Sequence, residues 1–83
     1  MDYLELFHDL LEDNRIKFNL KYHMKSNSKE TLIEIKSGND LVLKVTDSDY
    51  DNCYRKAYED LLFKIPIWEK RVDRVLREYR EGA

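Results

Sequence analysis

The chain has 83 residues, a formal net charge of −2 and 39% charged residues, enough for one small domain with a thin core. Its single cysteine leaves no partner for a disulfide or a multi-thiolate metal site. The N-terminus is acidic, unlike a cationic signal peptide, and no apolar run approaches the roughly 20 residues that span a bilayer. We therefore expect a single cytoplasmic domain over residues 1–83, with no membrane segment.

Residues 2–13 carry apolar side chains at three- and four-residue spacing, which predicts a helix. Asp2 and Glu5 lie in its first turn, where the helix dipole favours acidic groups. From residue 15 the repeat changes to two, since Ile16, Phe18 and Leu20 alternate with polar residues. This alternation predicts a strand over residues 15–24 with one face in water.

Two further alternating segments, residues 31–36 and 41–46, predict a second and a third strand. The turn between them contains Gly38, which tolerates a positive φ angle. In the third strand we expect Leu41, Leu43 and Val45 to face the core, and Val42 to face outward.

Helical spacing returns over residues 49–64, after the capping residues Asp47 and Asp49. Pro66 has no backbone N–H to donate, so we expect this helix to kink or end just before it. A last helix is predicted over residues 67–81. The fold class is thus α+β, ordered helix, three antiparallel strands, helix, helix, with the helices packed on one face of the sheet.

The order of elements over residues 2–65 is similar to that of double-stranded-RNA-binding domains. That family binds phosphates through a lysine cluster at the start of its last helix. The matching segment here, Asp47 to Asp51, is acidic and would repel a phosphate backbone. The resemblance is therefore one of layout.

The sequence shows no pattern typical of a catalytic site, a metal site or a cofactor. Three acids in Asp47 to Asp51 are spaced as in the opening of a calcium-binding loop, but Asn52 replaces the required glycine. Capping of a helix explains them more simply. His8, His23 and Cys53 form no nucleophile–base pattern, so we predict a protein that is not an enzyme and has no metal or cofactor.

Basic side chains gather on the outward positions of the predicted sheet. A solvated face explains them, but the same face is a candidate partner-binding surface. Its members are Arg15, Lys17, Lys21, Lys36 and Lys44.

The last helix carries a second candidate surface. Its apolar stripe should not remain in water, so it either folds back on its own core or meets another chain, for example as a homodimer through residues 67–79. Tryptophan, tyrosine and arginine are enriched at binding hot spots. The candidates here are Trp68, Arg71, Arg74, Arg77 and Tyr79.

These features favour a non-enzymatic module that binds a protein or nucleoprotein partner. An inhibitor or adaptor encoded by a phage or mobile element, of the anti-CRISPR type for example, fits this general character. The alternative is a small nucleic-acid-binding or regulatory protein that uses the basic sheet face or the arginine-bearing last helix.

Overall fold

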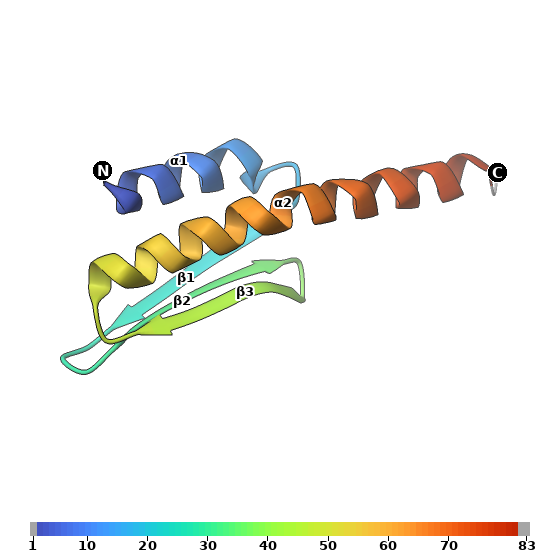
Figure 1. Ribbon diagram of the computed structural model, residues 1–83. Coiled ribbons are helices and arrows are strands. Elements are labelled where there is room, and N and C mark those ends of the chain that lie inside the picture. The colour runs from blue at the N-terminus through green and yellow to red at the C-terminus, as the bar shows by residue number, and fades with distance from the viewer. Residues whose placement is uncertain (1, 82–83) are drawn as a thin grey trace.

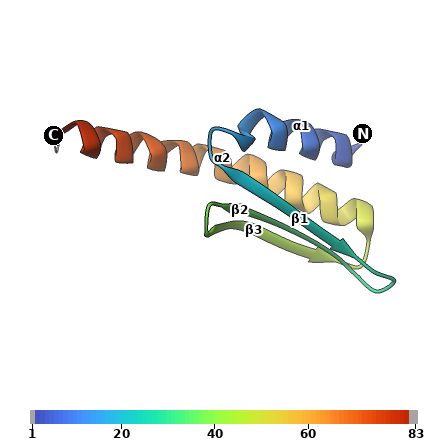
Figure 2. The same ribbon diagram turned by 180° about the vertical axis from the view of Figure 1, so that it is seen from behind.

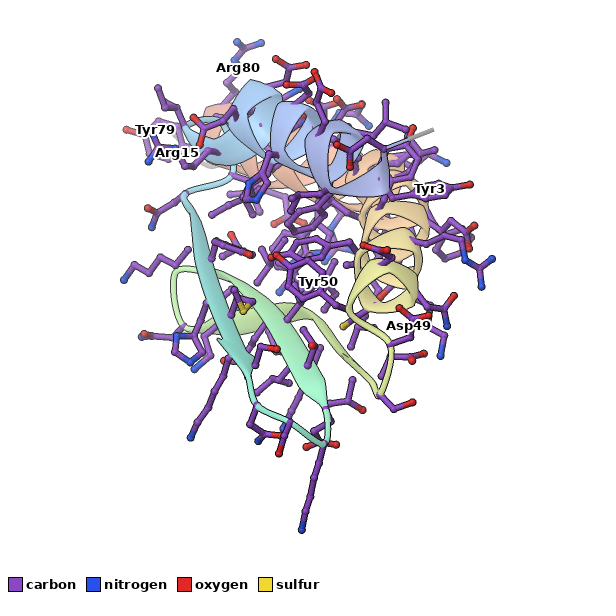
Figure 3. The ribbon with its side chains drawn as sticks, turned by 90° about the vertical axis from the view of Figure 1, so that its left-hand side faces the viewer. Tyr3, Arg15, Asp49, Tyr50, Tyr79 and Arg80 are labelled. Atoms are coloured by element: carbon purple, nitrogen blue, oxygen red, sulfur yellow. The ribbon has the colours of Figure 1, made fainter. Side chains whose placement is uncertain are left out.

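The computed structural model describes residues 2–81, with a sheet in the order β1-β2-β3 in which both neighbouring pairs are antiparallel. Both helices lie on the same side of this sheet, as the end-on view of Figure 3 shows. The predicted α+β class is confirmed. The elements, labelled in Figure 1, are α1 (Tyr3–Arg15), β1 (Leu20–Ser26), β2 (Thr31–Ser37), β3 (Asp40–Asp47) and α2 (Tyr50–Glu81).

Helix α1 begins at the N-cap Asp2, whose carboxylate accepts hydrogen bonds from the Leu4 and Glu5 backbone N–H groups. It ends later than predicted, at Arg15. The Phe18 N–H donates to the Asn14 carbonyl oxygen at 3.2 Å, so the chain leaves the helix through a turn, and β1 starts only at Leu20. The predicted strand over residues 15–24 is therefore wrong in its first half. Alternation of apolar and polar residues over so few positions does not distinguish a strand from the end of a helix.

A β-bulge lies opposite Ile35 and Lys36. Ile35 pairs with Leu43 while Lys36 pairs with Leu41, which leaves Val42 as an extra residue on β3. Val42 and Leu43 are consequently both buried, and Leu41 is 53% exposed. The expectation that Leu41 faces inward and Val42 outward is wrong, since the bulge reverses the alternation at this point.

Helix α2 continues through Pro66 to Glu81 without a break. The predicted division into helices over residues 49–64 and 67–81 is therefore wrong. Ile65 and Trp68, on either side of the proline, both pack against the core cluster, and this packing holds the helix across the missing hydrogen bond. Pro66 itself is exposed, which leaves its surroundings open to water.

The core lies between the sheet and the first half of α2, with α1 alongside. Figures 1 and 2 show that the second half of α2 extends past the end of the sheet, and the molecule is 53 Å long. The buried residues are Phe7, Leu11, Phe18, Leu20, Thr31, Ile33, Ile35, Val42, Leu43, Cys53, Tyr54, Ala57 and Leu61.

Candidate interaction surfaces

We call residues 67–80 of α2 the α2 extension, because this part of the helix runs beyond the sheet (Figures 1 and 2). Trp68 and Val72 are partly buried against the core cluster. Four large apolar side chains of the extension are more than half exposed. They are Ile67, Val75, Leu76 and Tyr79.

An open groove of about 330 Å³ lies where α2 leaves the sheet; we call it the junction groove. Its apolar lining comes from Phe18, in the turn between α1 and β1, and from α2. Polar groups border it at Lys17, Arg71 and Asp40. The apolar residues that α2 contributes are Trp68, Val72, Val75 and Leu76.

Hydrogen bonds between two turns position Phe18 in this groove. The Ser37 hydroxyl donates to the Phe18 carbonyl oxygen at 2.5 Å, and the Gly38 N–H donates to the Asn19 carbonyl oxygen at 3.3 Å. Asn19 and Gly38 both have positive φ angles, 52° and 60°. The turn before β1 is thus held to the turn between β2 and β3.

Charged side chains join these turns to α2. The Lys17 Nζ lies 3.0 Å from a Glu69 carboxylate oxygen. The Arg71 guanidinium carbon lies 4.9 Å from the centroid of the Trp68 ring, and the same side chain reaches Asp40 at 4.0 Å. These groups are about half exposed or more, so each pair stabilises the fold by at most about 1 kcal/mol. Their main effect is to orient Trp68 and Arg71 at the groove.

The basic residues predicted for the sheet face are divided by the fold. Arg15 lies at the end of α1, 3.4 Å from Glu12, and Lys17 borders the junction groove. Both were assigned to the sheet because the strand was predicted to start five residues too early.

The remaining basic residues do share the outward face of the sheet. Lys21 pairs directly with Lys36 across β1 and β2, and Lys44 lies opposite Glu34. The Lys36 Nζ is 3.6 Å from the Glu34 carboxylate, so Glu34 offsets part of the positive charge. We call Lys21, Lys36 and Lys44 the sheet lysines.

The predicted residues of the last helix all lie on the α2 extension. Arg74 forms an ion pair with Glu78 at 3.5 Å. Trp68 and Arg71 meet at the groove, whereas Tyr79 lies near the end of the helix and is exposed. Figure 3 shows Tyr79 and Arg80 pointing in different directions.

Sequence reasoning missed the part of the groove that does not belong to α2. Phe18 comes from the turn before β1 and Asp40 is the first residue of β3, and no short-range pattern indicated that either would meet a helix beyond Pro66. The hydrogen bonds and the helix continuity that bring them together are tertiary features.

The acidic segment before α2 caps the helix. Asp49 accepts hydrogen bonds from the Asp51 and Asn52 N–H groups. Asp47 lies 2.6 Å from the Lys56 Nζ and also accepts from Asn52 and from the Asp49 N–H. The hydrogen bond from Lys56 is the largest cause that lowers the pKa of Asp47 to about 2.

Cys53 and His8, which were considered from the sequence as candidate catalytic groups, pack in or beside the core. The Cys53 thiol is buried and points at the Thr31 carbonyl oxygen, at 3.4 Å, and burial raises its pKa. His8 packs edge-on against Tyr22, with ring centroids 5.4 Å apart. Among the side chains that the structure describes, those of residues 2–80, no three histidine, cysteine or acidic groups gather in a way that could hold a metal ion.

Helix α2 has 32 residues, but in the described part of the chain no helix combines the length and the apolar composition needed to cross a membrane.

Comparison of the chain with protein-family models, with curated proteins and with solved structures found no match. The function must therefore be argued from the geometry of the two surfaces.

Proposed function

We propose that this chain is a non-enzymatic binding module, which acts by occupying a surface of a protein or nucleoprotein partner through the α2 extension. The observation that supports this most strongly is a helix that carries Val75, Leu76 and Tyr79 beyond its own core, each more than half exposed. A protein rarely leaves such a cluster in water without a binding role. An amphipathic helix in a groove is a common mode of protein recognition.

The size of the exposed apolar surface sets the expected affinity for a partner. Burying one valine or leucine side chain contributes roughly 1.5–3 kcal/mol, and a micromolar complex needs about 8 kcal/mol. Several side chains must therefore act together, with Trp68 and Arg71 at the groove end and Tyr79 at the far end. Part of that gain is offset by the loss of translational and side-chain freedom on association.

The finer class that we propose is an inhibitor or adaptor encoded by a phage or mobile element. The support for this class is general: the chain is small, its surface charge is mixed, and its proposed binding surface lies on a projecting helix. We propose that such a chain, of the anti-CRISPR type for example, acts by covering a surface on a larger complex.

Affinity purification of the tagged full chain from its own host tests the binding role. The variant V75E/L76E places charges on exposed positions of the α2 extension, and K21E/K36E/K44E alters the sheet lysines as the matched control. We expect partners held by the wild-type chain to be retained by the sheet variant and lost with V75E/L76E, with circular dichroism confirming that both variants fold. Retention by V75E/L76E would contradict the proposal.

One observation favours a second candidate, an anion-binding role for the sheet face. Lys21 lies directly opposite Lys36, and like charges in that position destabilise a sheet, so a phosphate bound between them would stabilise it. Electrophoretic mobility shifts with DNA and RNA at two salt concentrations test this role. Salt-sensitive binding that K21E/K36E/K44E abolishes would support it, and no binding at low salt would exclude it.

A further inference from the structure

Eight apolar side chains of α2 form a stripe with a heptad repeat that continues from the core into the extension. Successive members of this stripe are separated alternately by four and three residues. A repeat of 3.5 residues is typical of helices that pair with another helix. The members are Tyr54, Tyr58, Leu61, Ile65, Trp68, Val72, Val75 and Tyr79.

The two halves of this stripe have different surroundings. Tyr54 and Leu61 are buried against the chain's own sheet and α1, and Ile65 packs at the edge of that core. Beyond the sheet the same stripe continues, but Val75 and Tyr79 are 58% and 79% exposed. The extension thus carries a helix-pairing stripe that its own chain leaves uncovered.

We propose that a second copy of this chain covers the stripe, with the two α2 extensions packed antiparallel about a twofold axis. The inference rests on the proposed function and names the partner of the same surface. In this pairing, Val72 of one copy faces Val75 of the other, and Trp68 faces Tyr79. The twofold symmetry repeats both contacts, so four layers fill the seam.

The antiparallel direction follows from the position of the sheet. The stripe over Tyr54 to Ile65 faces the chain's own core, so in a parallel pair the two sheets would compete for the same space. An antiparallel pair places the two sheets at opposite ends of the paired helices. The extension is long enough for this, because its helical residues, about 14 in number, span about 21 Å.

Charge complementarity selects the register. Arg71 and Glu78 lie at equivalent positions beside the stripe, and in this register Arg71 of one copy faces Glu78 of the other, twice by symmetry. A shift by one heptad toward the sheet would bring the two Arg71 side chains together. Both side chains are accessible, at 60% and 66% exposure.

The junction groove receives the end of the second helix. Tyr79 of the second copy lies opposite Trp68, beside Phe18, at a groove of about 330 Å³, which is the size range of sites that hold small molecules. The pairing therefore covers the junction groove and the exposed part of the stripe with one contact. Because the interface is short, we expect a weak, concentration-dependent dimer.

A charge-exchange experiment tests the pairing. R71E alone would set the substituted carboxylate against Glu78 of the second copy, and E78R alone would set Arg71 against a second guanidinium. Both variants should dimerise about tenfold more weakly than wild type, because two surface pairs change from attraction to repulsion. An equimolar mixture of the two variants restores attraction between the chains and should form a heterodimer near wild-type strength, measured by sedimentation velocity.

Two features make this readout specific. Glu78 also pairs with Arg74 of its own helix, but the loss of that pair persists in the mixture, so restored association must come from pairing between chains. R55E makes the same charge change in the first half of α2, outside the extension, and should leave dimerisation unchanged.

A wild-type chain that stays monomeric up to about millimolar concentration would overturn the pairing, as would a mixture that associates no better than the single variants. If the chain is monomeric and V75E/L76E still abolishes capture of a host protein, the second-copy inference fails while the proposed function stands. If neither self-association nor capture responds to V75E/L76E, both fail.

Discussion

The hydroxyl oxygens of Tyr22 and Tyr54 lie 2.6 Å apart, a hydrogen bond that joins β1 to α2 inside an aromatic cluster. Phe7 packs edge-on against Tyr54 with ring centroids 5.5 Å apart, and His8 packs similarly against Tyr22. Tyr54 is only 1% exposed. Burial is the largest cause that raises the pKa of both phenols.

The tyrosine pair predicts a loss of stability at alkaline pH. An unfolded chain loses phenol protons near pH 10, whereas the raised pKa keeps both phenols protonated in the folded chain. This contribution to stability is present below about pH 10 and is lost as pH rises beyond it. Y54F should lower the free energy of unfolding by about 1 kcal/mol at pH 7 and show a smaller alkaline decline in urea unfolding. An alkaline decline equal to that of wild type would contradict this account.

Asp47 predicts a loss of stability at acidic pH. Its pKa is about 2 in the folded chain, below its ordinary value of 3.8. The contribution is therefore present above about pH 4 and is lost as pH falls toward 2, because the unfolded chain takes up the proton first. The difference in free energy of unfolding between wild type and D47N should shrink over this range. K56M should raise the Asp47 pKa, measured by NMR titration of the carboxyl carbon; an unchanged pKa would argue against the ion pair.

Neighbouring leucines test the face that α2 presents to the sheet. Leu61 is 1% exposed and Leu62 is 49% exposed. L61A should lower the free energy of unfolding by about 2–5 kcal/mol through the cavity it leaves, while L62A should change it by less than about 1 kcal/mol. Comparable losses in chemical denaturation would mean that the rotation of α2 is wrong.

Pro66 is expected to weaken the middle of α2. Proline in a helix interior costs about 3 kcal/mol relative to alanine, and here it removes the hydrogen bond to the Leu62 carbonyl. P66A should therefore slow amide hydrogen exchange in the following turn, Ile67 to Lys70, without changing the rate in α1. Faster exchange after the substitution would contradict a continuous helix.

The sequence predicted those features that depend on local repetition. The helical spacing around Phe7 and Leu11 placed α1, and the alternation around Ile33 and Ile35 placed β2, because side-chain period follows directly from backbone geometry. The turn at Gly38 was equally local. These signals were sufficient for the α+β class and the order of the strands.

The features that were predicted wrongly depend on tertiary contacts, which form only in the folded chain. The bulge at Val42 and the helix end near Arg15 are decided by pairing across the sheet and by backbone hydrogen bonds. Pro66 carries a strong local signal for a break, which packing of Ile65 and Trp68 on the core overrides. The junction groove could not be predicted for the same reason, since Phe18 meets α2 only because the helix continues.

The central claim is that α2 passes Pro66 as one helix and carries its apolar stripe away from the sheet. Backbone carbon chemical shifts over residues 60–80 of the full chain test this most directly. The structure predicts helical shifts on both sides of Pro66, from Asp60 to Arg80. Shifts that return to unstructured values between Lys64 and Ile67, followed by a separate helix, would contradict it.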